Sequence, residues 1–290
     1  MTYHLVVGDR TYSSWSLRGW LLFEKFDIPR KTTWLDFMTA PIVDQLSEMG
    51  LAPAQTLPTV VLPEGAVISE SLSLAEELAQ RHPDANIWPA APDMRALSRN
   101  LAAEMATGFH ALRGHCPMNL RLAYSGVHVP SDVAGNLRRL ETIWADALSK
   151  SGGPWLCGEY SAADVFFAPV AARIAGYGLQ VDQTAQAYVD HHLNDPAFRR
   201  WRAMALASRD NPNRYAKDYA RTTWPGPTPM AAKPVAQGPS ENANCPYSGD
   251  PVTDFMELDG RVFGFCNPFC RDKTVNDPQA WPDFMRIYHS

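Results

Sequence analysis

Apolar and polar positions recur with two different periods in the first 80 residues of the chain. Residues 3–7 alternate and are rich in β-forming side chains, which predicts a strand. Serines precede the apolar-periodic run that starts at Leu17, and serine there is typical of a helix N-cap. The same criteria predict strands over 3–7, 32–37, 57–62 and 66–69 and helices over 17–26 and 71–80. The order β-α-β followed by β-β-α indicates an α/β unit.

The pattern changes where prolines gather near residues 83–92. Beyond this boundary the periodicity is helical and no strand is expected between residues 93 and 220. Residues 224–240 contain five prolines, which is typical of an extended, semi-rigid linker. Helices are expected near 93–123, 131–150, 161–177 and 184–208. We therefore expect an α/β domain over 1–83, an all-α domain over 92–222, a Pro-rich linker over 223–240 and a small module over 241–290.

Composition and charge exclude several classes of protein. Hydrophobic residues make up 46% of the 290 residues and charged residues 20%, which is ordinary for a globular chain. No apolar run approaches the roughly 18 residues that cross a bilayer, and the N-terminus lacks the features of a secretory signal. A net charge of −5 without a basic stripe argues against a nucleic-acid binder. The sequence therefore predicts a cytoplasmic protein with no membrane and no nucleic-acid partner.

Three motifs follow one another in the α/β unit: Tyr12-Ser-Ser-Trp-Ser-Leu-Arg18 at the first helix, Leu57-Pro58 before the third strand, and Glu70-Ser71 at the second helix. With an α/β unit followed by an all-α domain, they resemble the soluble glutathione transferase family over roughly residues 1–220. The first motif is similar to the Ser-Ser-x-Ser-x-Arg signature of zeta-like and related bacterial members. The resemblance implies a thioredoxin-like N-terminal domain, glutathione as co-substrate, a small electrophile as second substrate, and a homodimer.

The serines of the first motif can activate the thiol of a ligand although the protein has no cysteine at this position. A thiol with an ordinary pKa is mostly protonated at neutral pH, and only the thiolate is a nucleophile. A hydroxyl that donates to sulfur at a helix N-terminus would favour the thiolate through a charge-assisted bond and the helix dipole. Ser13 or Ser14 fits this role, and the family motif selects Ser13 with Ser14 close behind. The alternative is that both serines only cap the helix.

The other two motifs would hold the peptide part of glutathione. A cis bond before Pro58 would turn Leu57 outward, so that its backbone pairs with the ligand like a neighbouring strand. The resemblance assigns Glu70 to the ligand's ammonium group, Ser71 to the γ-glutamyl carboxylate at a helix N-terminus, and Gln55 to the glycyl end. The alternatives are an ordinary edge-strand proline and a solvated acid in the first helical turn.

Several residues depart from the family pattern or argue for other activities. Trp15 stands where zeta-like members have a small or thiol residue, which argues against zeta-type isomerisation. Arg18 is expected to form a surface ion pair rather than to face an acidic substrate. No cysteine lies near residue 13, so dithiol exchange is disfavoured. Cys116 and Cys157 are expected to be packed thiols, although a redox enzyme that uses either one stays a rival hypothesis.

The remaining three cysteines, Cys245, Cys266 and Cys270, lie in the last 46 residues of the chain. A cysteine, about 20 residues and a C-x3-C after a Gly-aromatic hairpin resemble the small treble-clef-like modules known as TRASH or YHS domains. Clustered thiolates suit Zn²⁺, which would stabilise so small a core. The alternative is a metal-free module that packs its aromatic side chains on the main body. Candidate fourth ligands are Asp250, Asp254, Asp272, His289 and water, with His289 or water preferred.

These observations favour an enzyme that conjugates glutathione to a small electrophile, or catalyses a related glutathione-dependent reaction. A rival from a different class is a non-catalytic glutathione-binding scaffold whose terminal module recruits a partner.

Overall fold

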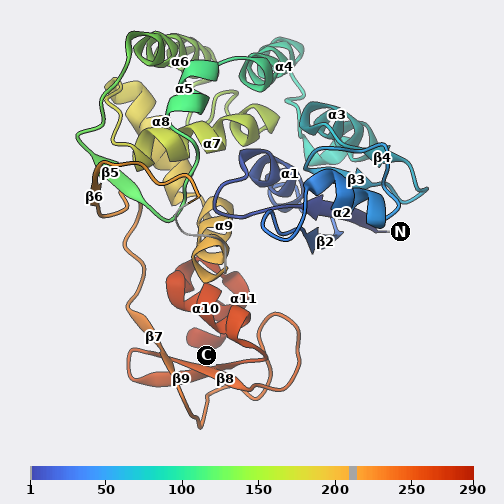
Figure 1. The fold of residues 1–290 in the computed structure, drawn as a ribbon, viewed down its shortest axis with the longest axis vertical. Helices are drawn as coiled ribbons and strands as arrows, with labels where there is room; N and C mark the ends of the chain where they lie inside the picture. Colours follow the sequence, from blue (N-terminus) through green and yellow to red (C-terminus); the bar gives the residue numbers. More distant parts are fainter. Residues whose placement is uncertain (1, 209–213) are drawn as a thin grey trace.

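The computed structural model describes residues 2–208 and 214–290. A four-stranded sheet forms the N-terminal domain, with the order β2-β1-β3-β4 (Figure 1). Strand β1 pairs parallel to β2 and antiparallel to β3, and β3 pairs antiparallel to β4. The elements are β1 Tyr3–Val7, α1 Ser14–Glu24, β2 Arg30–Trp34, α2 Ile42–Glu48, β3 Thr59–Val61, β4 Val67–Ile68 and α3 Ser71–Arg81. The expected thioredoxin-like unit is confirmed, with the additional helix α2 between β2 and β3.

Alternation along β1 places apolar side chains on both faces of the sheet. Leu5 and Val7 are fully buried in the large core that includes α1 and α3. Val6 is fully buried in a separate small cluster with Leu46 of α2. The two helix layers therefore cover opposite faces of the sheet, which fixes the start of α1 at one end of β1.

The second domain is a helical bundle, as expected, and it includes one small sheet. The helices expected over 93–123 and 184–208 are each divided, into α4 and α5 and into α8 and α9. Helix α7 is its central element, and Ser161 and Asp164 form a capping box at its start. Strand β5 contradicts the expectation of no strand before residue 220, because it pairs with β6 from the end of the domain. Residues 209–213 of the expected domain lie outside the described residues. The elements are η1 Pro83–Ala85, α4 Pro92–Thr107, α5 His110–His115, β5 Ala123–Ser125, α6 Ser131–Ser151, α7 Ala162–Gly176, α8 Gln183–Asn194, α9 Pro196–Ala207 and β6 Ala220–Thr222.

The last part of the chain is a β-hairpin followed by short helices, preceded by an edge strand. Residues 232–235, inside the segment expected to be a linker, form strand β7 at the edge of a sheet with the order β7-β8-β9. An edge position suits a strand that contains proline, here Pro234. The elements are β7 Ala232–Val235, β8 Asp254–Leu258, β9 Arg261–Phe265, α10 Pro268–Asn276, η2 Pro278–Ala280 and α11 Pro282–Tyr288. We call β7 to α11 the C-terminal module.

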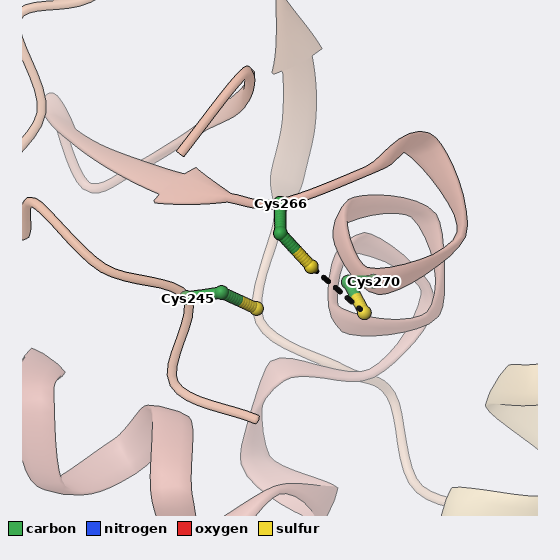
Figure 2. Close-up of side chains that lie close together, drawn as sticks. All are labelled: Cys245, Cys266 and Cys270. Carbon is green, nitrogen blue, oxygen red and sulfur yellow. Dashed lines mark hydrogen bonds between the residues drawn. The ribbon is translucent and has the colours of Figure 1, made fainter. Parts of the chain in front are cut away.

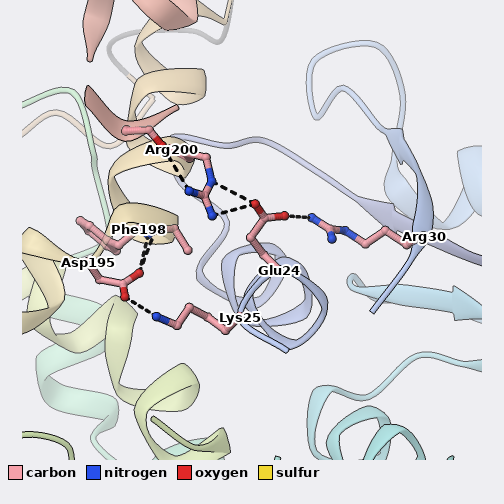
Figure 3. A network of polar contacts seen from close by, with 8 residues as sticks. Glu24, Lys25, Arg30, Asp195, Phe198 and Arg200 are labelled. Carbon is pink, nitrogen blue, oxygen red and sulfur yellow. Dashed lines mark hydrogen bonds and ion pairs between the residues drawn. The ribbon is translucent and has the colours of Figure 1, made fainter. Parts of the chain in front are cut away.

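Helix α9 joins the three parts of the molecule (Figure 1). Glu24 at the end of α1 accepts hydrogen bonds from Arg30 and Arg200, and Lys25 pairs with Asp195, the N-cap of α9 (Figure 3). Arg200 also donates to the backbone oxygen of Ala280 in the C-terminal module, at 3.2 Å. The module is therefore docked on α9 and does not hang free on its linker. Among the described residues, no helix is both long and apolar enough to cross a membrane.

Candidate functional site

A cleft of about 490 Å³ lies where the N-terminus of α1 meets the β2–α2 connection and the start of α3. Four residues that the sequence assigned to the site line it: Ser13, Gln55, Leu57 and Glu70. Its other lining residues are Trp15, Phe37, Ile42, Thr56, Ser69 and Ala106. Residues 57 positions apart in the chain thus share one cavity, which the sequence motifs required but could not show.

Ser13 is the N-cap of α1 and lies at the cleft. Its backbone is extended, and its side-chain oxygen accepts from the backbone N–H of Ser16 at 3.2 Å. Its hydroxyl donates to the side-chain oxygen of Ser16 at 2.8 Å. The N–H groups of the first helical turn have no partners within the helix, so this end of α1 favours an anion. A half-exposed hydroxyl at such a position can turn from Ser16 toward a ligand.

Ser14 follows Ser13 in sequence but points away from solvent. It is 4% exposed, and its side-chain oxygen accepts from the guanidinium of Arg173 on α7 at 2.9 Å. Arg173 also donates to the backbone oxygens of Cys116 and Pro169. Ser14 is therefore held in an interdomain network, and it is not among the residues that line the cleft.

The Leu57–Pro58 peptide bond is cis, as expected. Pro58 packs directly on α1 at Gly19, where a Cβ atom would lie 2.4 Å from the proline ring. Glycine within a helix lowers its stability, so this close approach explains its presence in α1. The contact fixes the loop that carries Leu57 against the helix that carries Ser13.

Glu70 and Ser71 lie at the start of α3. Glu70 is the N-cap of α3, is exposed and lines the cleft. Ser71 is the first residue of the helix and is 3% exposed. It is not among the cleft-lining residues, while Gln55 is exposed at the rim. Carboxylate and helix N-terminus together offer partners for an ammonium and a carboxylate.

Sequence reasoning missed the apolar wall of the cleft. Phe37, Ile42 and Ala106 come from the β2–α2 connection, α2 and α4, and none of them belongs to a motif. Trp15, singled out only as a departure from the family pattern, lines the cleft beside Ser13. The one signal in the sequence was this tryptophan, because a large aromatic side chain at the start of a helix remains partly exposed and can therefore line a cleft.

The expectation for Arg18 is wrong. Arg18 is 1% exposed, and its Nε and Nη1 have no hydrogen-bond partner within the described residues. Its guanidinium lies 5.3 Å from the ring centre of Trp15 and 5.0 Å from that of Phe166. Burial, followed by repulsion from Arg173 and Arg113, lowers the pKa of Arg18 to about 9. The domain interface closes over this side chain, which the sequence of α1 alone does not reveal.

Cys116 and Cys157 are buried thiols, as expected. Burial raises the pKa of each to about 11, so both stay protonated at neutral pH. Because the thiolate is the reactive form, these environments argue against the redox rival.

Three thiols meet in the C-terminal module (Figure 2). The sulfur atoms of Cys245, Cys266 and Cys270 all lie within 4.8 Å of one another. Burial opposes ionisation of Cys245, but the backbone N–H groups of Tyr247, Cys266 and Ser248 lower its pKa to about 7. The hydroxyl of Ser248 and the amide of Asn267 both donate to the Cys266 sulfur, at 3.3 and 3.2 Å. The thiolate is the ligand form for Zn²⁺, and the backbone N–H groups favour it at Cys245, whereas burial raises the pKa of Cys270 to about 12.

Of the candidate fourth ligands, none from the described chain joins this group of three sulfurs. Asp254 and Asp272 both pair with Arg271, at 3.1 and 2.8 Å. His289 lies beside Tyr288 at the end of α11. The donor set fits three positions of a tetrahedral site, which leaves water as the fourth ligand of the set considered.

Comparisons with known proteins point to one family and one fold. Residues 12–81 match the family model described as "Glutathione S-transferase, N-terminal domain". A Caenorhabditis elegans protein described as "Probable maleylacetoacetate isomerase" is 28% identical over 166 residues, which cover 56% of this chain and 73% of that protein.

Two solved structures show the same fold. A glutathione transferase homolog from Burkholderia, with bound glutathione, has a TM-score of 0.55 at 18% identity and covers 72% of this chain and 100% of its own. Glutathione transferase Omega 3C from Trametes versicolor has a TM-score of 0.51 at 16% identity and covers 70% and 88%. Residues 12–81 therefore match a glutathione S-transferase N-terminal domain, and the chain has the glutathione transferase fold.

Proposed function

We propose that the protein is a glutathione transferase that uses the cleft to add the glutathione thiolate to a small electrophile. One observation carries this proposal: Ser13, Leu57 and Glu70, which come from three separate motifs, line a single cavity at the N-terminus of α1 together with Gln55. The N-terminal domain match and the glutathione named in the Burkholderia structure support glutathione as the co-substrate.

The backbone of Leu57 pairs with the peptide part of glutathione, and Gln55 contacts its glycyl end. Glu70 binds its ammonium group, and Ser71 at the start of α3 binds the γ-glutamyl carboxylate. These contacts direct the cysteinyl sulfur toward Ser13. The Ser13 hydroxyl then donates to sulfur, and the N-terminus of α1 favours the negative charge. No general base is required, because the thiol loses its proton to solvent once its pKa falls below the ambient pH.

The electrophile binds on the apolar side of the cleft. Trp15, Phe37, Ile42 and Ala106 give that side an apolar surface that includes one residue of the helical domain. The thiolate attacks the electrophilic atom, a carbon–sulfur bond forms, and the electron pair moves to the leaving group or the adjacent acceptor. Zeta-like members have a smaller residue at the position of Trp15. The bulk of Trp15 leaves less space in the cleft there, which favours conjugation over isomerisation.

The test is binding and turnover measured on the same preparation. Calorimetry with glutathione is expected to show one site per chain, and a panel of chromogenic electrophiles is expected to show turnover that depends on glutathione. Retention on glutathione resin without turnover of any electrophile would favour the scaffold hypothesis. If the protein shows neither glutathione binding nor turnover, the assignment of the cleft is refuted.

We also propose that Cys245, Cys266 and Cys270 hold one Zn²⁺ with water as the fourth ligand, and that the protein is a cytoplasmic homodimer. The clustered sulfurs support the first part, because three thiolates and Zn²⁺ give a site with a net charge of −1. In this module the ion would have a structural role and takes no part in the conjugation.

A further inference from the structure

Three arginines meet behind the first turn of α1, and within residues 2–208 and 214–290 no carboxylate forms a salt bridge with any of them. Arg18 lies on α1, Arg113 on α5 and Arg173 on α7. The guanidinium groups of Arg18 and Arg113 lie 5.3 and 4.5 Å from the ring centre of Trp15. Arg173 donates to Ser14, one helical turn before Arg18 on the same face of α1. We call these three side chains the arginine cluster.

The cluster is costly for the fold. Arg18 and Arg173 are 1% and 4% exposed. None of the three arginines forms a salt bridge with a carboxylate of the described residues. Removing a charge from water without a compensating partner is strongly unfavourable. Even so, the guanidinium groups stay charged at neutral pH, because burial and mutual repulsion lower the pKa of Arg18 only to about 9 and that of Arg173 only to about 10. Arg173 and Arg113 donate to uncharged oxygens, so hydrogen bonds are present but no described carboxylate balances the positive charge. Buried charge of one sign gathered at one place points to a function.

Direct contact with a substrate does not explain the cluster. Arg18 is closed off from solvent, and its guanidinium lies over the ring of Trp15, which itself lines the cleft. Arg173 donates to Ser14, Cys116 and Pro169. None of the three arginines lines the cleft. Their charge, by contrast, acts through space and needs no access, and a low-dielectric surrounding strengthens it.

We propose that the arginine cluster stabilises the thiolate of glutathione bound at Ser13, an inference that rests on the proposed glutathione chemistry. The bound thiolate supplies the negative charge that the cluster lacks. The hydroxyl of Ser13 orients the sulfur. Arg18, Arg113 and Arg173 supply positive charge from a distance without touching the sulfur, so they are positioning residues and not catalytic residues.

The other ionisable groups at this end of α1 leave that field in place. Cys116 and Tyr177 face Arg173, and burial raises the pKa of both, so they are neutral at pH 7. Lys217 adds to the positive field near Cys116. The carboxylates of Asp9, in the loop before α1, and of Glu70, at the start of α3, oppose it. Asp9 spends its oxygen on backbone N–H groups of the loop, and Glu70 meets the ligand's ammonium.

The test compares Arg18→Met with wild type by following the ultraviolet absorbance of bound thiolate against pH. A unit charge about 10 Å away, through an effective dielectric of about 20, changes an ionisation equilibrium roughly tenfold. Removing the Arg18 charge is therefore expected to raise the thiol pKa by about one unit, and the acidic limb of the kcat/KM profile should move with it. Arg18→Lys should restore both. The melting temperature of Arg18→Met should rise, whereas a merely structural arginine would give a fall.

Arg113→Gln is the second variant, because its half-buried site tolerates a polar side chain, and it should shift the thiol pKa in the same direction. Arg202→Met is the matched control: this arginine is half-buried on α9, stacks on Trp224 at 4.4 Å, and should leave the thiol pKa unchanged. An unchanged thiol pKa in both Arg18→Met and Arg113→Gln, in proteins that bind glutathione, overturns the inference and leaves the proposed function standing. Wild-type protein that binds no glutathione would overturn both.

Discussion

The two adjacent serines at the start of α1 give opposite predictions, because one lies at the cleft and the other in the domain interface. Replacing Ser13 by alanine removes the hydroxyl that the proposed mechanism aims at sulfur, and it also removes the cap of α1. Replacing Ser14 by alanine leaves the cleft intact but deprives Arg173 of a buried acceptor at 2.9 Å. Activity and stability should therefore separate between the two variants.

The expected magnitudes follow from these contacts. One preorganised donor to an anion is worth roughly 10- to 1,000-fold in rate, so Ser13→Ala should lower kcat/KM by that range. Loss of the cap lowers the free energy of unfolding by about 0.5–2 kcal/mol. For Ser14→Ala, an unsatisfied buried guanidinium N–H costs about 1–3 kcal/mol of stability, and the loss of activity should stay below that of Ser13→Ala.

Ser13→Gly is the control that separates capping from chemistry. Glycine at an N-cap costs only a few tenths of a kcal/mol, so Ser13→Gly should be nearly as stable as wild type and yet as inactive as Ser13→Ala. The assays are steady-state conjugation kinetics and urea denaturation, with glutathione affinity measured by calorimetry and expected to change little. Full activity in Ser13→Gly would refute the hydroxyl mechanism. Lost activity in Ser14→Ala alone would move the role to Ser14.

Three further predictions concern the ligand, acid stability and the metal. Glu70→Gln should weaken glutathione binding by about 1–3 kcal/mol in calorimetry, because it strands the ligand's ammonium group, and unchanged affinity would contradict its assignment. Burial, then Lys25 and His191, lower the pKa of His192 to about 3, so the unfolded chain binds the extra proton as pH falls below about 6.5. Stability is thus lost toward acid, and His192→Leu should recover about 2 kcal/mol of unfolding free energy at pH 5 relative to pH 7, whereas parallel wild-type and variant curves would contradict it. Elemental analysis of protein purified without chelator should find up to one Zn²⁺ per chain, with loss in Cys266→Ser, and metal-free wild type would show that the thiols are merely packed.

Hydrophobic periodicity predicted the helices and strands with a clear amphipathic pattern. It missed elements with a weak pattern and elements that depend on pairing with residues far away in the sequence. Helix α2 escaped notice because it buries only Leu46 and has no side-chain cap, so its sequence carries little amphipathic signal. Strand β5 is three residues long and pairs with residues almost 100 positions later. The break between α8 and α9 was missed, because one helix was expected over 184–208, although Asp195 followed by Pro196 is a readable N-cap with proline at the first helical position.

The candidate site shows a similar division. Motifs brought Ser13, Leu57 and Glu70 together, because each carries a local backbone feature that is written in the sequence. The choice between Ser13 and Ser14 depends on the phase of α1 against α7, which no local pattern encodes. The burial of Arg18 likewise depends on a domain interface formed by α5 and α7. A residue that the sequence of α1 places at the surface is therefore buried in the structure.

The C-terminal module supports the rest of the molecule without entering the cleft. Every cleft-lining residue lies at or before position 106, so deleting residues 231–290 should leave glutathione affinity unchanged. Stability should fall, because α9 would lose the bidentate ion pair between Arg199 and Asp277, at 2.8 and 2.7 Å, and the apolar face under α10 would meet water.

Asp277→Asn in the full chain is the matched test of docking. It keeps the size of the side chain and removes the charge that Arg199 faces in a site where both are less than a fifth exposed, so the free energy of unfolding should fall by about 1–3 kcal/mol. Calorimetry and thermal denaturation of both proteins decide the matter. Weaker glutathione binding in the deletion variant would mean that the module shapes the cleft through α9. Unchanged stability in both the deletion variant and Asp277→Asn would mean that the C-terminal module does not stabilise the rest of the fold.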